Sequence, residues 1–315
     1  MDPLVKTVNL KKYFQSGQGL LHAVDGIDIE IKRGKTLGVV GESGCGKSTL
    51  GRCVLRLLEP TSGEVYFEGK NILDYNKNQM KDLRRQMQII FQDPYSSLNP
   101  RMSVFELISE PLDMNKVFSN KAEKTAYVLE LMDTVGLATR FINSYPHELD
   151  GGRRQRIGVA RALALKPKFI VCDEPVSALD VSIQAQILNL LMDLQEERDL
   201  TYMFISHDLS VVKHISDEIA VMYMGKCVER APANELFKKP MHPYTCALLA
   251  AIPTIKLGQQ ISHNLIKGEV TSPINPKPGC RFSNRCEKYT EECSKRDFKL
   301  VEAEPEHFVA CRLYE

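Results

Sequence analysis

The sequence lacks the features that mark membrane-spanning, secreted and polyelectrolyte-binding proteins. Its longest apolar runs, such as residues 246–252, are far shorter than the roughly 18 residues that a membrane span requires. The 41 Lys and Arg residues almost balance the 40 Asp and Glu residues, and this net charge of +1 disfavours nucleic acid or anionic lipid as the main partner. No basic segment followed by an apolar stretch opens the sequence, so we expect no signal peptide and a cytoplasmic location.

Internal repeats and low-complexity tracts are also missing, and the nine cysteines do not suit a disulfide framework. An odd number leaves one thiol unpaired, and the cytoplasm keeps thiols reduced. With 43% hydrophobic and 26% charged residues, the composition is that of a globular protein rather than a disordered one. A length of 315 residues allows about two structural units.

Hydrophobic patterning predicts an α/β fold with a helical insertion. The predicted strands are residues 5–10, 23–31, 35–40, 169–172 and 202–205, and the predicted helices are residues 47–58, 125–137 and 181–198. Between residues 93 and 166 the pattern is that of amphipathic helices with few strand signals. After residue 236 the chain becomes helical again, then Pro-rich and finally Cys-rich.

A glycine-rich loop lies between a predicted strand and a predicted helix. It matches G-x-x-x-x-G-K-[ST], which in this context predicts a phosphate-binding loop. Glycines let successive N–H groups point at phosphate oxygens, and the helix N-terminus adds positive potential. We expect Lys47 to bridge the β- and γ-phosphates and Ser48 to place its hydroxyl on Mg²⁺. The residues expected to bind ATP here are Gly41, Glu42, Ser43, Gly44, Cys45, Gly46, Lys47, Ser48 and Thr49.

Two acidic residues follow the predicted strand at residues 169–172. A phosphate-binding loop needs an acid associated with Mg²⁺ at the end of a neighbouring strand, and Asp173 is expected to fill that role. Glu174 is expected to polarise the attacking water as general base.

The segment Glu148-Leu149-Asp150-Gly151-Gly152-Arg153-Arg154-Gln155-Arg156 resembles the signature of ATP-binding cassette (ABC) ATPases. Phe91-Gln92-Asp93-Pro94 is similar to the Q-loop of that family, Ser177-Ala178-Leu179-Asp180 to its D-loop, and Ile205-Ser206-His207-Asp208 to its switch-histidine segment. The resemblance implies a P-loop NTPase (RecA-like) core over residues 1–92 and 166–236 with an antiparallel β N-terminal subdomain. It further implies a helical signature subdomain over residues 93–165 and a C-terminal extension over residues 237–315.

In this family two subunits close head to tail around two ATP molecules, each held between one phosphate loop and the other subunit's signature. By resemblance, Gln92 would contact Mg²⁺ or the attacking water, and His207 would act as the catalytic switch. An aromatic residue before the phosphate loop would stack on adenine, and Tyr13 and Phe14 are the two candidates, with family spacing favouring Phe14. The residues implied for the partner's ATP are Leu149, Asp150, Gly151, Gly152 and Arg153.

The signature departs from the family's common Leu-Ser-Gly-Gly-Gln, because Asp150 replaces the serine and Arg153 the glutamine. A carboxylate near the γ-phosphate repels it, by about 4 kcal/mol for two unit charges 4 Å apart at an effective dielectric of 20. One hypothesis is therefore a heterodimer in which the site formed by this signature is altered. The alternative is that Asp150 simply caps the following helix, as serine would.

The stretches His242-Pro243-Tyr244-Thr245 and Lys267-Gly268-Glu269-Val270, with Pro278-Gly279-Cys280-Arg281-Phe282, resemble the C-terminal extension of the oligopeptide and dipeptide importer branch of ABC ATPases. The branch uses two non-identical ATPase subunits, two membrane permeases and an extracytoplasmic binding protein. The resemblance implies an ATPase on the cytoplasmic face of the membrane that drives uptake of di- or oligopeptides. The alternatives are import of nickel or another small solute and, from a different class, a soluble ABC ATPase of nucleic-acid maintenance or translation.

Four of the cysteines lie close together in the extension. Cys280, Cys286, Cys293 and Cys311 follow the spacing C-x5-C-x6-C-x17-C. Four thiolates suit a 4Fe-4S cluster or tetrahedral zinc, and free thiols remain a third possibility. Resemblance to members of the branch that carry a cluster here favours the 4Fe-4S cluster.

Overall fold

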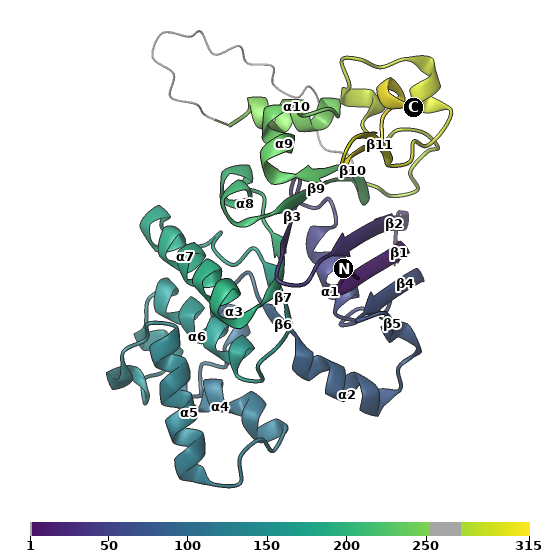
Figure 1. Cartoon of the computed structure of the whole chain (residues 1–315). Helices are drawn as coiled ribbons and strands as arrows, with labels where there is room; N and C mark the ends of the chain where they lie inside the picture. The colour runs from purple at the N-terminus through teal and green to yellow at the C-terminus, as the bar shows by residue number, and fades with distance from the viewer. Residues whose placement is uncertain (1, 253–271) are drawn as a thin grey trace, which may run out of the picture. The chain divides into compact units, whose positions relative to one another are not determined.

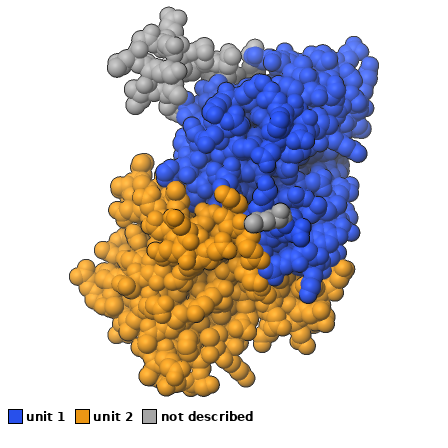
Figure 2. Space-filling view, in the orientation of Figure 1, with its two compact units in different colours: residues 1–32, 36–73, 204–315 blue, residues 33–35, 74–203 orange. Residues whose placement is uncertain are grey.

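The computed structural model describes residues 2–252 and 272–315 (Figure 1). The stretch Lys267-Gly268-Glu269-Val270, which contributes to the resemblance of the C-terminal extension, lies outside the described residues. The chain forms two compact units (Figure 2). Unit 1 comprises residues 1–32, 36–73 and 204–315, and unit 2 comprises residues 33–35 and 74–203.

Unit 1 contains an antiparallel sheet with the strand order β2-β1-β4-β5. Its strands are β1 (Val5–Ser16), β2 (Gly19–Ile31), β4 (Ser62–Phe67) and β5 (Lys70–Asn71). Both β1 and β2 are longer than predicted, because their pairing continues to Ser16 opposite Gly19. Ile27, Ile29 and Ile31 alternate along β2 and are buried, as expected for a strand with one face on the core.

The second sheet of unit 1 leads directly into the glycine-rich loop. Strand β3 (Thr36–Val40) is buried at every residue and pairs in parallel with β9 (Glu218–Tyr223). Strands β10 (Lys226–Pro232), β12 (His307–Val309) and β11 (Val301–Glu304) continue the sheet beyond β9 in that order. A continuous apolar strand such as β3 is typical of a parallel sheet covered on both faces.

Helix α1 (Lys47–Val54) follows the glycine-rich loop, as predicted, but ends before the predicted residue 58. It stops because Arg56 adopts a left-handed φ of 50°, and the Leu57 N–H turns back to the carbonyl oxygen of Arg52. Leu57 continues the apolar repeat of this stretch, but it is 46% exposed and does not pack into the core. The other helices of unit 1 are η1 (Ile72–Asp74), α8 (Leu209–Ile215), α9 (Ala233–Lys238), α10 (Pro243–Ala250), η4 (Ser283–Arg285), η5 (Glu291–Ser294) and η6 (Arg312–Tyr314).

Unit 2 combines parallel strands with helices. Strand β6 (Met87–Ile90) pairs in parallel with β7 (Phe169–Asp173), and β8 (Thr201–Ile205) is the other neighbour of β7. The helices are α2 (Lys77–Gln86), α3 (Pro94–Ser97), α4 (Val104–Met114), α5 (Lys121–Thr134), η2 (Thr139–Phe141), η3 (Pro146–Glu148), α6 (Gly151–Leu163) and α7 (Val181–Arg198).

Helix α7 has the predicted bounds, whereas α5 begins and ends earlier than the predicted residues 125–137. The Asn120 side chain accepts the Ala122 N–H at 2.8 Å and so starts α5 one turn sooner. The predicted strands do not include β4, β5, β6, β9, β10, β11 or β12. Across the described residues, no helix combines the length and apolar character that a membrane span would need.

Candidate functional site

Two glycines of the phosphate-binding loop lie where no other residue fits. Gly41 has a φ of 151°, and a Cβ atom there would fall 2.1 Å from the Met222 carbonyl oxygen. Gly46 has a φ of 105°, and its Cβ would fall 1.9 Å from the Ala23 carbonyl oxygen. The loop is therefore pressed against the backbone of neighbouring strands in a conformation that favours glycine.

Lys47, the first residue of α1, is 4% exposed and reaches back into this loop. Its Nζ donates to the carbonyl oxygens of Gly41 at 2.8 Å and Glu42 at 3.1 Å. Ser48 and Thr49 are half-buried in the first turn of the same helix. The sequence-predicted phosphate-binding residues thus share one loop and one helix N-terminus in unit 1.

Glu42 is held by two residues that the sequence analysis did not single out as part of the site. Arg285 binds its carboxylate through both Nη1 at 2.8 Å and Nη2 at 3.0 Å. The Tyr244 hydroxyl accepts the Glu42 backbone N–H at 3.0 Å. No sequence pattern signals these contacts, because the partners lie more than 200 residues away along the chain.

His207 also lies in unit 1, directly after β8, and its side chain is exposed. The Ser206 N–H donates to the Val39 carbonyl oxygen at 3.2 Å, which places this segment beside the strand that leads into the phosphate-binding loop. Asp208 caps α8 by accepting the Ser210 N–H at 2.8 Å. The backbone around His207 is therefore fixed on both sides.

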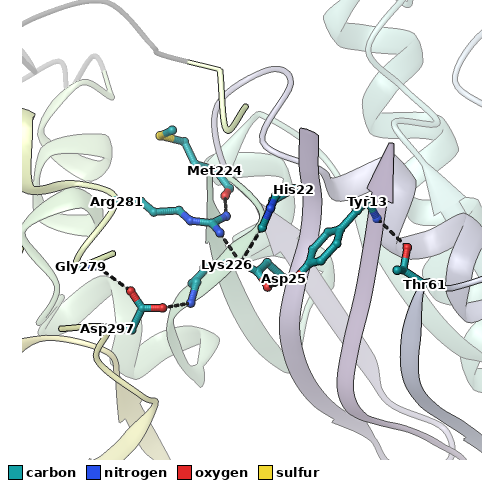
Figure 3. A network of polar contacts seen from close by, with 9 residues as sticks. All are labelled: Tyr13, His22, Asp25, Thr61, Met224, Lys226, Gly279, Arg281 and Asp297. Carbon is teal, nitrogen blue, oxygen red and sulfur yellow. Dashed lines mark hydrogen bonds and ion pairs between the residues drawn. The ribbon is translucent and has the colours of Figure 1, made fainter. Parts of the chain in front are cut away.

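The two adenine-stacking candidates have different surroundings. The Tyr13 ring stacks on His22 with 4.0 Å between ring centroids, and its hydroxyl donates to Asp25 at 2.5 Å (Figure 3). Burial and the hydrogen bond to Asp25 raise the pKa of Tyr13. The Phe14 ring instead has the Lys12 ammonium 5.0 Å from its centroid. Tyr13 is thus part of a polar network, whereas Phe14 is not.

In unit 2, two candidate catalytic residues are in contact. Gln92, just after β6, donates from Nε2 to the Glu174 Oε2 at 2.9 Å. Glu174 follows β7 with a left-handed φ of 48°, which is uncommon for a non-glycine residue and typical of functional positions. Asp173 is the last residue of β7 and is buried. The predicted Q-loop glutamine and general base therefore form one hydrogen-bonded pair.

The signature segment, Leu149–Arg153, enters helix α6. Asp150 is the N-cap of α6, and its carboxylate accepts the Arg153 N–H at 2.8 Å and pairs with the Arg153 guanidinium. A Cβ on Gly152 would come within 2.7 Å of Ile183 Cγ2, so the start of α6 packs closely against α7. The capping function proposed for Asp150 is present in the structure.

The D-loop, Ser177–Asp180, connects β7 to α7. The Ser177 N–H and hydroxyl both bond to the Glu174 carbonyl oxygen, at 3.3 and 3.1 Å. Leu179 lies against the signature, because a Cβ on Gly151 would meet its Cδ2 at 3.1 Å. The D-loop thus connects the candidate general base to the beginning of α6.

Four cysteines of the C-terminal extension line one pocket together with His242, Phe282 and Phe298, namely Cys280, Cys286, Cys293 and Cys311. Burial raises the pKa of Cys280 to about 11 and also raises the pKa values of Cys286 and Cys311. For Cys293, burial raises the pKa, but hydrogen bonds with Thr290 and the charge of Arg312 lower it overall. Over residues 2–252 and 272–315, no three His, Cys, Asp or Glu side chains form a group that could hold a metal ion. Four thiols match a metal site in the kind and number of ligands, but their arrangement in the described residues does not.

Known protein families match two parts of the chain. A family described as ABC transporter matches residues 24–177, and one described as oligopeptide/dipeptide transporter, C-terminal region, matches residues 228–293. The chain is 50% identical over 315 residues to the putative oligopeptide transport ATP-binding protein YkfD of Bacillus subtilis, covering 99% of this chain and 96% of that protein. It is 48% identical over 300 residues to the dipeptide transport ATP-binding protein DppF of Escherichia coli, covering 93% and 90%.

Solved structures are also similar to this chain. The dimeric, post-hydrolysis form of the ATP-binding cassette MJ0796 bound to ADP and Pi has a TM-score of 0.67 at 30% identity, covering 73% of this chain and 98% of that chain. The cbiO1 protein of Clostridium perfringens, part of the ABC transporter complex cbiONQ, has a TM-score of 0.67 at 29% identity, covering 76% and 92%. The expected P-loop fold is confirmed, and the chain belongs to the ABC transporter ATPases with an oligopeptide/dipeptide transporter C-terminal region.

Proposed function

We propose that this protein is the ATP-hydrolysing subunit of an importer for di- or oligopeptides. The observation that carries the proposal is similarity over nearly the whole chain, C-terminal region included, to proteins named for dipeptide and oligopeptide transport. The constrained glycines and the buried lysine of the phosphate-binding loop support ATP as the energy source. In this proposal the protein works at the cytoplasmic face of the membrane.

We propose the following roles in hydrolysis. Lys47 and the loop N–H groups bind the phosphates, and Phe14 or Tyr13 stacks on adenine. Ser48, Gln92 and Asp173 hold Mg²⁺, directly or through water, and the bound ion neutralises charge that develops on the phosphates. Glu174 accepts a proton from the attacking water, Gln92 orients Glu174 through their hydrogen bond, and His207 acts as the switch.

We propose that a second, non-identical ATPase subunit and two membrane permeases complete the complex, with a binding protein outside delivering the solute. Residues 93–165 serve as the helical signature subdomain, and residues 237–315 as the extension specific to this branch. The similar cassette MJ0796 is dimeric with ADP and Pi, which supports a head-to-tail dimer for this chain as well. The signature residues Leu149–Arg153 then face the ATP on the partner subunit's phosphate loop.

The test is a pull-down of the tagged Glu174→Gln protein from membranes in the presence of Mg-ATP. Glu174→Gln removes the general base, so the complex should accumulate with ATP bound. We expect two permeases and a second ATPase in the mass spectrum, and the matched control Lys47→Ala should recover less of the second ATPase. Recovery of ribosomes, nucleic acid or soluble enzymes alone would refute the transport function.

We separately propose that the two ATP sites of the heterodimer are unequal, because Asp150 places a carboxylate in the site that this signature forms. Asp150 is paired with Arg153, which offsets part of its repulsion of the γ-phosphate. Asp150→Ser keeps the cap and removes the charge, so turnover by the assembled complex should rise. If Asp150→Ser changes neither ATP affinity nor turnover, Asp150 acts as a helix cap alone.

We further propose that the four cysteines bind a 4Fe-4S cluster, with zinc as the alternative. The four thiols line one pocket, and this supports the proposal, although among the described residues no three of them are arranged to hold a metal ion. Anaerobically purified protein should absorb at about 400 nm and release acid-labile sulfide. Stoichiometric zinc without sulfide would favour the alternative, and neither metal would leave the cysteines as free thiols.

A further inference from the structure

Two arginines of the C-terminal extension bind carboxylates of strand β2 and of the phosphate-binding loop, which together are called the nucleotide-binding part of unit 1. Arg281 and Arg285 lie between Cys280 and Cys286. Arg281 pairs with Asp25, which also accepts the Tyr13 hydroxyl (Figure 3). Arg285 pairs with Glu42, the residue after Gly41 in the phosphate-binding loop. One short segment therefore pairs with the carboxylate that binds the hydroxyl of an adenine-stacking candidate and with a carboxylate of the phosphate-binding loop.

The Arg285–Glu42 pair has the geometry of a strong contact rather than a surface ion pair. Both terminal nitrogens of Arg285 donate to the two Glu42 oxygens, at 2.8 and 3.0 Å. The Arg285 side chain is 8% exposed and that of Glu42 is 21% exposed. Bidentate pairs of this kind are directional, and limited exposure reduces their screening by salt.

Arg285 is itself fixed by an aromatic cluster of Tyr223, Tyr244 and Phe282. The Tyr223 hydroxyl accepts from Arg285 Nη1 at 3.3 Å. Ring centroids lie 4.6 Å apart for Tyr223 and Tyr244 and 5.3 Å apart for Tyr223 and Phe282. Phe282 also lines the cysteine pocket, so the cluster connects that pocket to Arg285.

All the polar groups of Glu42 are engaged. Arg285 binds its carboxylate, the Tyr244 hydroxyl accepts its N–H, and Lys47 donates to its carbonyl oxygen. The position of Glu42 sets the path of the loop immediately after Gly41. A shift of Glu42 would therefore also displace the carbonyl oxygen that binds the Lys47 ammonium.

The charge of Glu42 makes Arg285 relevant to ATP. A carboxylate in a loop that takes polyphosphate repels its ligand unless a cation neutralises it. Arg285 supplies that cation, from a segment outside the phosphate-binding motif. We propose that Arg285 is a positioning residue for ATP binding: it holds Glu42 in place and neutralises it, so that the cysteine-rich segment acts on nucleotide affinity.

The competing explanation is that Arg285 only fastens the extension to the rest of unit 1. Lys226 provides a matched control, because it pairs with Asp297 of the extension at 2.6 Å without contacting the phosphate-binding loop (Figure 3). A fastening role predicts that Arg285→Ala and Lys226→Ala have similar effects. A positioning role predicts that only the Arg285 variant changes ATP affinity.

The experiment measures Mg-ATP affinity by calorimetry, steady-state ATPase kinetics and thermal unfolding on the full-length protein. Arg285→Ala should raise Kd and KM for ATP about tenfold while kcat changes less than about twofold. Arg285→Lys, which keeps the charge but loses the bidentate contact, should raise both about threefold. The double variant Arg285→Ala/Glu42→Gln should recover most of the affinity, because the repelling carboxylate is gone.

Three results would overturn the proposal: an unchanged Kd in Arg285→Ala, an equal rise in Lys226→Ala, or no recovery in the double variant. If Arg285→Ala does not fold, Arg285→Lys decides the question, since an unchanged KM in that variant refutes positioning.

Discussion

The side-chain amide of Gln92 donates a 2.9 Å hydrogen bond to the carboxylate of Glu174. The two residues follow β6 and β7, which pair in parallel with Ile90 opposite Cys172. Each residue lies two positions beyond this pair, so the strand register brings them to the same edge. The contact between Q-loop and candidate general base is thus a direct result of the sheet.

Gln92→Glu should therefore lower kcat by at least about tenfold, because it replaces a donor to Glu174 with a like charge beside it. KM for ATP should change less than kcat, since Gln92 lies outside the phosphate-binding loop and is one of three residues proposed to hold Mg²⁺. Steady-state ATPase assays test this, with Gln88→Glu on β6 as the matched control that keeps normal turnover. Equal losses in the two variants would show that the effect is not specific to the Gln92–Glu174 pair.

Gly46→Ala should cost more stability than Gly44→Ala, although both glycines have positive φ. At Gly44 nothing lies within 4 Å of an added Cβ, so the cost is only the left-handed backbone, about 1–2 kcal/mol. At Gly46 the added Cβ would lie 1.9 Å from the Ala23 carbonyl oxygen, and the backbone must move. Urea unfolding and ATP titration measure both effects, and only Gly46→Ala should abolish ATP binding.

The phosphate-binding loop and the strand before Asp173 were predictable because their signals are local. A strand, a glycine loop and a lysine at the helix start occupy one short stretch, and β7 is a compact apolar run. Where α1 ends was not predictable from periodicity, because Leu57 continues the apolar repeat but is exposed. The left-handed turn at Arg56 ends the helix without the glycine that usually marks it.

The contacts between the extension and the nucleotide-binding part had no signal in the sequence. Arg285 and Glu42 are 243 positions apart, and Arg281 and Asp25 are 256 apart. Arg281 lies in a stretch that resembles the extension of this branch, but that resemblance indicates no contact with Asp25, and the cysteines around both arginines draw attention to metal chemistry instead. Only the three-dimensional structure, which places both arginines against carboxylates, brings these residues into the site.

Asp25→Asn should destabilise the protein at neutral pH and weaken the pH dependence of its stability in acid. Burial raises the pKa of Asp25, but the Tyr13 hydrogen bond and the Arg281 charge outweigh it, so the pKa lies below the ordinary 3.8. The unfolded chain then binds more protons than the folded one around that pH. The stabilisation from Asp25 is complete above about pH 4 and is lost as pH falls through the folded-state pKa.

We expect Asp25→Asn to cost about 1–3 kcal/mol at pH 7 and progressively less below pH 4, as measured by urea unfolding across pH. Glu64→Gln is the matched control, because Glu64 also accepts a tyrosine hydroxyl, that of Tyr66 at 2.9 Å, but is exposed. Its cost should stay below about 0.5 kcal/mol. A constant difference between wild type and Asp25→Asn down to acid pH would contradict the assigned pKa shift.

Glu229 is fully buried and joins three segments of unit 1. Its carboxylate accepts the backbone N–H groups of Met241 at 2.8 Å and His242 at 2.9 Å and contacts His307 Nε2 at 2.7 Å. Glu229→Ala leaves these donors buried without an acceptor, so we expect a loss of about 3–5 kcal/mol in the free energy of unfolding. Glu229→Gln keeps one acceptor oxygen and should cost less. Glu235→Ala, which removes an exposed partner of Lys238, should change stability by less than about 0.5 kcal/mol.

Glu229 joins β10 to β12 and to the start of α10, so limited proteolysis of Glu229→Ala should cut near residues 241–242 before the rest of the chain. Cleavage elsewhere first would show that Glu229 does not hold the extension in place.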